Sequence, residues 1–272
     1  MAEIRRAAVA GMFYPENQTT LKKVIGEFYS RATLPQTYRN VKGLVVPHAG
    51  YIYSGQTAAY GFKTLDEKNI KTVIVLSPSH HEYFPGVCVY DGDGYETPFG
   101  IVPVNKEKAE LLVTDSKILF MGKSGHQEEH AIEVNLPFLQ MLLPRFDFVP
   151  VVMGDQSDTY VDALAERLTH IMDEYTVIVA SSDLSHYYNK EIAKKLDDKV
   201  ANSLVEYDYT TLQENLNSST CQACGGGLIV SMMKALDTDE QRKMSIVHRS
   251  DSGDVSGDNR RVVGYLSAAV YS

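Results

Sequence analysis

Four short apolar runs rich in β-branched residues constrain the fold more than any other feature of the sequence. They carry few polar side chains on either face, and they span residues 43–47, 72–78, 146–154 and 176–183. Strands of this kind are buried on both sides, which is typical of a parallel sheet covered by helices. The sequence therefore predicts an α/β fold with a mainly parallel central sheet flanked by helices.

Helical patterns lie between these runs, and two other stretches look like hairpins. Between the third and fourth runs, apolar side chains recur at the spacing of one helix face, and Asp158 is a candidate N-cap. Ser54 is a candidate N-cap for a helix after the first run. Residues 86–104 and 243–272 combine strand-like segments with Gly and Asp turns. We therefore expect the central sheet to be mixed.

Length, charge and cysteine content narrow the class of protein. No Gly/Ser linker interrupts the 272 residues, so we expect one domain spanning residues 1–272. A formal net charge of −9 argues against nucleic-acid or anionic-membrane partners. No apolar run approaches the ~20 residues of a spanning helix. Three cysteines are too few for a disulfide framework, which favours a cytoplasmic location.

Histidines follow three of the four predicted strands. His48 follows the first, His80 and His81 the second, and His186 the fourth. Because ligands bind outside the carboxyl ends of strands in open α/β sheets, we expect these side chains to meet at one rim. Imidazole binds zinc, iron and copper and is also a general base, so two histidines are candidate metal ligands and the third a proton carrier. Asp183 is a candidate to orient a histidine or to add a carboxylate ligand. The structural alternative for each histidine is that it caps a loop or bonds a nearby carbonyl.

Two further clusters carry candidate functional side chains. His130 and Glu133 share one face of a short helix, and the alternative is a solvated acidic helix start. Pro137 is expected to kink or end that helix. Cys224 precedes three glycines and an apolar helical run, where the helix dipole favours a thiolate ligand or nucleophile. Cys88 lies in an apolar strand and is expected to belong to the core.

Several segments of the chain resemble the Memo family: RRAAVAGMFYP, VVPHAGYIYSG, VLSPSHH, EEHAIEVNLPFL, SSDLSHY, ACGGG and VVGYLSAAVY. That family resembles in fold the class III, LigB-type extradiol ring-cleaving dioxygenases, in which two histidines and a carboxylate hold iron(II). The resemblance implies His48 and His80 as metal ligands and His186 as the acid/base. Cys224 takes the place of the carboxylate, which makes a softer site that suits zinc or copper as well as iron.

Three functions follow from these residues and this resemblance. The first is a metal-dependent, dioxygenase-like oxidoreductase with His48, His80 and Cys224 on iron, copper or zinc. The second is a zinc- or cysteine-dependent hydrolase, and the third is a non-catalytic scaffold that binds a peptide or phospholigand in the same pocket. The resemblance also implies a functional link to radical-SAM and AMMECR-type proteins, with an unknown small molecule or peptide as substrate. We predict three catalytic residues: His186, Asp183 and His130.

Overall fold

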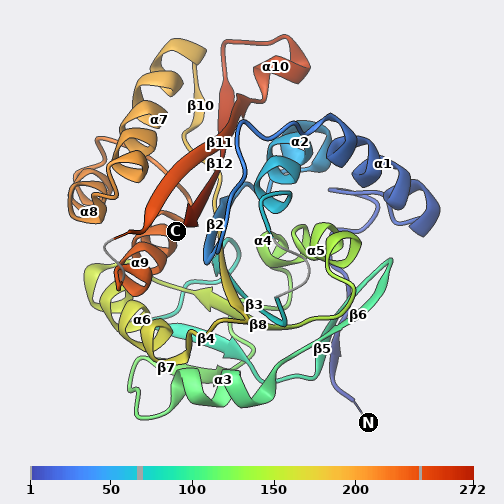
Figure 1. Cartoon of the computed structure of the whole chain (residues 1–272), viewed down its shortest axis with the longest axis vertical. Helices are drawn as coiled ribbons and strands as arrows, with labels where there is room; N and C mark the ends of the chain where they lie inside the picture. The colour runs from blue at the N-terminus through green and yellow to red at the C-terminus, as the bar shows by residue number, and fades with distance from the viewer. Residues whose placement is uncertain (1, 66–69, 239–240) are drawn as a thin grey trace.

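The computed structural model describes residues 2–65, 70–238 and 241–272. A large mixed sheet runs through the centre, and helices cover it on both sides (Figure 1). Its nine strands are β2 (Gly43–Val46), β3 (Thr72–Pro78), β4 (Val87–Tyr90), β7 (Leu119–Gly122), β8 (Asp147–Met153), β9 (Thr176–Ser181), β10 (His186–Tyr188), β11 (Lys243–Asp251) and β12 (Val262–Tyr271).

The four predicted apolar runs form the middle of this sheet. They pair in parallel in the spatial order β2–β9–β3–β8, and almost every residue in them is buried. On one side β12 pairs antiparallel with β2, and on the other β4 pairs antiparallel with β8. Both the parallel core and the mixed character that we predicted are therefore confirmed.

A second, three-stranded sheet lies near the N-terminus of the chain (Figure 1). The segment predicted as a hairpin contributes two of its strands, which pair antiparallel. Its members are β1 (Ile4–Arg5), β5 (Gly94–Thr97) and β6 (Gly100–Pro103).

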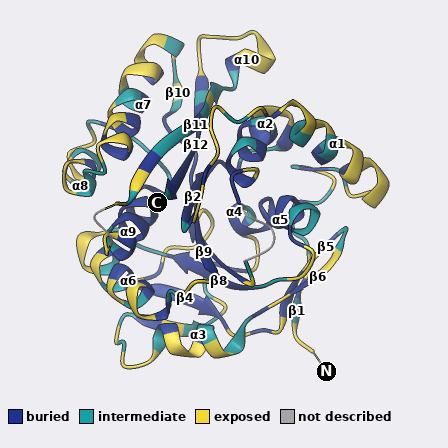
Figure 2. Cartoon of the chain, viewed as in Figure 1, coloured by how far each residue is buried: buried dark blue, intermediate teal, exposed yellow. Residues whose placement is uncertain are grey.

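Ten helices surround the central sheet in the described residues. They are α1 (Gln18–Arg31), α2 (Tyr51–Phe62), α3 (Lys106–Val113), α4 (His130–Glu133), α5 (Leu136–Leu142), α6 (Asp158–Ile171), α7 (Lys190–Val205), α8 (Tyr209–Asn217), α9 (Gly226–Leu236) and α10 (Gly253–Ser256). Helices α1, α2, α4 and α5 lie on one side of the sheet, and α6, α8 and α9 lie on the other (Figure 1). Figure 2 shows that the strands between these layers are buried, while the outward surfaces of α1 and α6 are exposed.

Helix starts differ from the sequence-based expectation in two places. Helix α2 begins at Tyr51 with Gly50 as its N-cap, so the predicted cap at Ser54 is wrong. Ser54 lies inside the first turn, where its hydroxyl donates to Ala49 O at 2.9 Å. Helix α6 has its N-cap one residue before Asp158.

Pro137 ends one helix and starts another, as its missing N–H requires. Helix α4 stops at Glu133, and Pro137 lies in the first turn of α5. No helix in the described ranges is long and apolar enough to cross a membrane. The assignment of residues 1–272 to one domain stays a prediction.

Candidate metal centre

His48, His80 and Cys224 come together at one rim of the central sheet. His48 lies in the turn from β2 to α2, His80 lies just after β3, and Cys224 lies just before α9. Strands β2 and β3 both pair in parallel with β9, one on each side of it. Their carboxyl ends therefore lie at the same edge of the sheet, close together. The potential ligand atoms of the three side chains all lie within 4.8 Å of one another.

The ring of His48 is held so that one nitrogen faces Cys224. Its Nδ1 lies 2.9 Å from Ser181 Oγ at the end of β9, and its Nε2 lies 3.1 Å from Cys224 Sγ. The backbone N–H of His48 donates to Asp183 Oδ1 at 2.8 Å. Burial lowers the pKa of His48 to about 3, so the ring is neutral near pH 7 and has a lone pair available for a metal ion.

His80 is oriented by the buried carboxylate of Glu129. Glu129 accepts from His80 Nδ1 at 2.9 Å and from His80 N at 2.8 Å, so Nε2 remains free. Burial alone would raise the pKa of Glu129, but hydrogen bonds from His80 and Ala131 N lower it to about 2. The sequence analysis did not single out Glu129, because an acidic residue before a short helix is also typical of a solvated helix start.

Cys224 lies at this rim of the sheet, just before the N-terminus of α9. Its Sγ accepts a hydrogen bond from Asp183 N at 3.1 Å. A Cβ on Gly225 would lie 2.4 Å from Ser181 O, so only glycine lets α9 approach β9 this closely. Burial raises the pKa of the Cys224 thiol well above its ordinary value. The expected effect of the helix dipole is therefore outweighed by desolvation while no cation is bound.

Asp183 joins the two loops that carry His48 and Cys224. The side chain is buried, its carboxylate accepts the His48 N–H, and its backbone carbonyl accepts the Cys224 N–H at 3.1 Å. Burial raises its pKa. These contacts tie Asp183 to both His48 and Cys224.

A third imidazole, that of His130, adjoins the first two. Its ring centroid lies 4.5 Å from that of His80 and 5.4 Å from that of His48, and Phe13 packs on it at 4.8 Å. Burial and the neighbouring His48 lower the pKa of His130 to about 4. His80, Glu129 and His130 form a second group with ligand atoms within 4.8 Å, although Glu129 is already engaged by His80.

His186 is half-buried on β10 and is not part of this cluster of rings. Within the described residues, ring contacts join His48, His80 and His130, whereas His186 contacts Tyr187. His186 Nδ1 lies 2.8 Å from Leu184 O, an arrangement that places the proton on Nδ1 and leaves Nε2 as the acceptor.

Glu133 has a different environment from that of a solvated acidic helix. It forms a fully buried ion pair with Arg5. The same carboxylate accepts from Ala8 N at 2.7 Å, Val9 N at 3.0 Å and Tyr14 OH at 2.6 Å. Glu133 thus fastens the N-terminal segment to α4, beside His130.

Other cysteine, aspartate and histidine side chains of the described residues lie outside the centre. Cys88 is buried in β4, as predicted, and Cys221 is also buried. The Asp-rich segment near the C-terminus forms a turn in which Asp251 Oδ1 accepts from Gly253 N at 2.8 Å. His81 is exposed after β3.

Comparisons with known proteins agree on one family. The family described as Memo-like protein matches residues 5–269. A MEMO1 family protein of Thermoplasma volcanium is 34% identical over 265 residues, which cover 97% of each chain. A MEMO1 family protein of Methanocaldococcus jannaschii is 36% identical over 287 residues, covering 99% of this chain and 100% of the relative.

One solved structure shares the fold at low sequence identity. It is the crystal structure of an uncharacterized protein from Escherichia coli K12, with a TM-score of 0.53 and 15% identity. The match covers 84% of this chain and 99% of that chain. This similarity supports the α/β architecture alone.

Proposed function

The chain belongs to the Memo family, and on this premise we propose that it is a metal-dependent oxidoreductase whose metal ion is bound by His48, His80 and Cys224. The main support is the convergence of these three side chains, from three separate turns, to within 4.8 Å of one another. Their donor chemistry gives further support, since two imidazoles and a thiolate suit zinc, copper and iron.

The spacing of the donor atoms fits a metal ion. Metal–nitrogen bonds of ~2.0 Å and metal–sulfur bonds of ~2.3 Å place tetrahedral ligand atoms about 3.5 Å apart. His48 Nε2 and Cys224 Sγ are 3.1 Å apart, so a small separation of the two admits the ion. Each histidine also has its other nitrogen held by a neighbour, Ser181 or Glu129, as metal-binding histidines usually do.

Three protein ligands leave coordination positions open, which is typical of catalytic rather than structural sites. A bound ion would supply Lewis acidity and, if it is iron or copper, a redox couple. The His80 side chain is 28% exposed, so a substrate can approach from that side. His186, with Nε2 as acceptor, serves as the proton carrier, and Asp183 positions the loops of His48 and Cys224.

Metal analysis of protein purified anaerobically, without a metal-affinity column, tests the ligand set. We expect about one equivalent of iron, copper or zinc in the wild type and a loss of that metal in Cys224→Ala. Cys221→Ala is the matched control, because it removes a buried thiol outside the ligand set. Equal metal content in the wild type and Cys224→Ala would contradict the proposed ligands.

The oxidoreductase assignment needs a separate measurement. Protein loaded with iron or copper is reduced anaerobically and then exposed to air, while its absorption and paramagnetic resonance spectra are followed. Reversible oxidation of the bound ion supports the assignment. A centre that retains only zinc under all loading conditions contradicts it and points to hydrolysis.

The contact between Cys224 and His48 also favours a second candidate, a cysteine-dependent hydrolase. The raised pKa of the Cys224 thiol works against this candidate, because a protonated thiol is a poor nucleophile. Iodoacetamide labelling of metal-free protein separates the two. Fast, stoichiometric labelling at Cys224 near pH 7 favours the hydrolase, and an inert thiol excludes it.

A further inference from the structure

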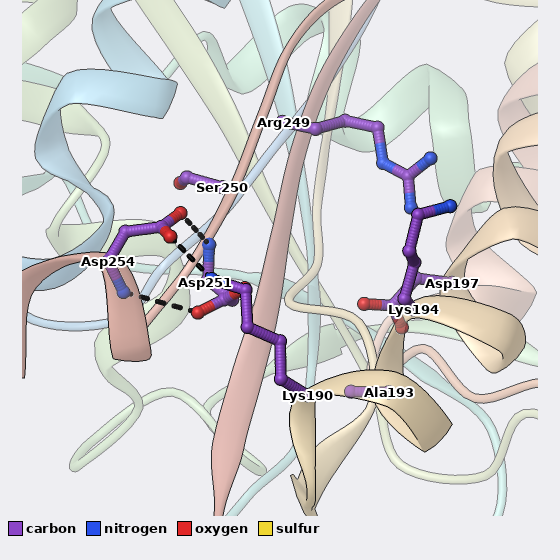
Figure 3. A pocket seen from close by; sticks show the side chains of 8 residues that line it. All are labelled: Lys190, Ala193, Lys194, Asp197, Arg249, Ser250, Asp251 and Asp254. Carbon is purple, nitrogen blue, oxygen red and sulfur yellow. Dashed lines mark hydrogen bonds and ion pairs between the residues drawn. The ribbon is translucent and has the colours of Figure 1, made fainter. Parts of the chain in front are cut away.

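A cavity of about 370 Å³ lies between α7 and β11 (Figure 3). None of its lining residues belongs to the candidate metal centre. Its volume falls in the range of small-molecule sites, about 300–1,000 Å³. Its wall combines cations and carboxylates from α7, β11 and α10. The charged lining residues are Lys190, Lys194, Asp197, Arg249, Asp251 and Asp254.

Most of these charges are already paired. Lys190 Nζ lies 2.9 Å from Asp251 and 2.6 Å from Asp254. Figure 3 shows these two aspartates next to one another. On the other wall, Lys194 and Arg249 share the carboxylate of Asp198, at 2.6 Å and 2.7 Å. The lining cations therefore all have carboxylate partners.

Asp197 is the carboxylate without a cation. It is 5% exposed, and its Oδ1 accepts from Ser185 N at 3.0 Å. Across residues 2–65, 70–238 and 241–272, no Lys, Arg or His nitrogen lies within 4.0 Å of its oxygens. Burial raises its pKa, and the hydrogen bonds from Ser185 and the charge of Arg249 offset this only in part.

The fold makes room for this carboxylate. Gly264 on β12 lies so close that a Cβ there would be 2.0 Å from Asp197 Oδ2. Any side chain larger than hydrogen at Gly264 would displace Asp197 from its place at the cavity wall. The buried position of Asp197 is thus built by two elements, α7 and β12.

We propose that this cavity binds a small primary amine, whose ammonium group pairs with Asp197. An ammonium carries one positive charge and three N–H donors, and it would give Asp197 the ion pair that it lacks, beyond the neutral donors of Ser185 and the more distant charge of Arg249. A metal ion fits less well. Among the described residues, two groups of side chains could hold a metal ion, and both lie at the candidate metal centre and exclude Asp197.

The amide of Ser185 provides a direct readout of binding, because it donates to Asp197. Full-length protein labelled with ¹⁵N-serine is titrated with butylamine hydrochloride, with sodium chloride as the reference. We expect a saturable shift of the Ser185 amide with butylamine alone. The absence of a saturable shift, or the same shift with sodium chloride, would overturn the proposal.

Two variants test the role of Asp197. Asp197→Asn keeps an oxygen for the Ser185 N–H but loses the charge, so butylamine affinity should fall about tenfold or more. The matched control is Asp162→Asn, which removes an exposed carboxylate on α6 that pairs with Lys234; its affinity should equal that of the wild type. Unchanged affinity in Asp197→Asn would overturn the proposal.

A third variant does not alter the buried carboxylate at all. Lys194→Ala removes a cation from the cavity wall, and the Lys194 side chain is 70% exposed, so the fold should tolerate the change. Less repulsion should make butylamine bind a few-fold more tightly. Weaker or unchanged binding would contradict an ammonium site at Asp197.

Discussion

Replacing Glu129 by glutamine tests how strongly the metal centre depends on a carboxylate that orients a ligand. In the wild type, Glu129 accepts hydrogen bonds from His80 Nδ1, His80 N and Ala131 N, at 2.9, 2.8 and 2.8 Å. Glutamine has one acceptor oxygen, and its NH₂ group would face at least one of these N–H donors. The variant therefore loses the contact that turns His80 Nε2 toward the metal site, or leaves a buried N–H unpaired.

The two losses have separate magnitudes. Loss of a partner that orients a metal-binding histidine typically weakens metal affinity about 10–100-fold, which corresponds to about 1.4–2.7 kcal/mol. A buried N–H without an acceptor lowers the free energy of unfolding by about 1–3 kcal/mol. We therefore expect Glu129→Gln to fold, with a lower metal affinity and a lower free energy of unfolding than the wild type.

Competition with a chromophoric chelator measures the metal affinity, and urea unfolding in the presence of EDTA measures the stability of the metal-free protein. Glu128→Gln is the matched control, since Glu128 is the exposed neighbour on the same segment. Wild-type metal affinity in a folded Glu129→Gln variant would refute the reasoning. An equal loss of affinity in Glu128→Gln would also refute it, because the effect would then not come from His80.

Three further predictions concern the fold around the centre. Glu133→Gln should lower the free energy of unfolding by about 3–5 kcal/mol in a urea titration, because it removes the charge that pairs with buried Arg5; a wild-type free energy of unfolding would contradict this. Gly225→Ala should lower the free energy of unfolding by about 1–3 kcal/mol, since its Cβ would clash with the β9 backbone. Gly26→Ala has open space around it in α1, so it should raise the free energy of unfolding by about 0.5–1 kcal/mol in the same urea assay. Burial between Tyr95 and Cys88 lowers the pKa of His126 to about 3, so as the pH falls the unfolded state takes up this proton first. His126 should therefore contribute about 2 kcal/mol to the loss of stability between pH 7 and pH 5, in addition to the share of His48 and His130; a wild-type pH slope in His126→Gln would contradict this.

Local sequence patterns were sufficient for much of the fold. The runs that became β2, β3, β8 and β9 are apolar on both faces, and a strand of that kind is stable only in a covered sheet. The start of α2 was placed wrongly at Ser54 because capping preferences are weak and Gly50 allows the same turn.

The rim that carries the candidate metal ligands was also predictable in outline. His48 and His80 follow apolar strands directly, and parallel strands bring their carboxyl ends to one edge of a sheet. The local pattern before the apolar helical run indicated Cys224 as a candidate ligand or nucleophile, but its grouping with His48 and His80 came from the resemblance to a family. The roles of His186, Asp183 and His130 in a reaction stay predictions.

What the sequence determined by itself was therefore the set of buried strands and the edge at which their histidines end, because these depend on residues adjacent in the chain. The tertiary structure alone decided which distant groups support them. Glu129 meets His80 across 49 positions, and Glu133 meets Arg5 across 128. The periodicity of α4 shows which side chains share a face, but the N-terminal segment packed against that face makes Glu133 buried rather than solvated, and no local pattern contains that information.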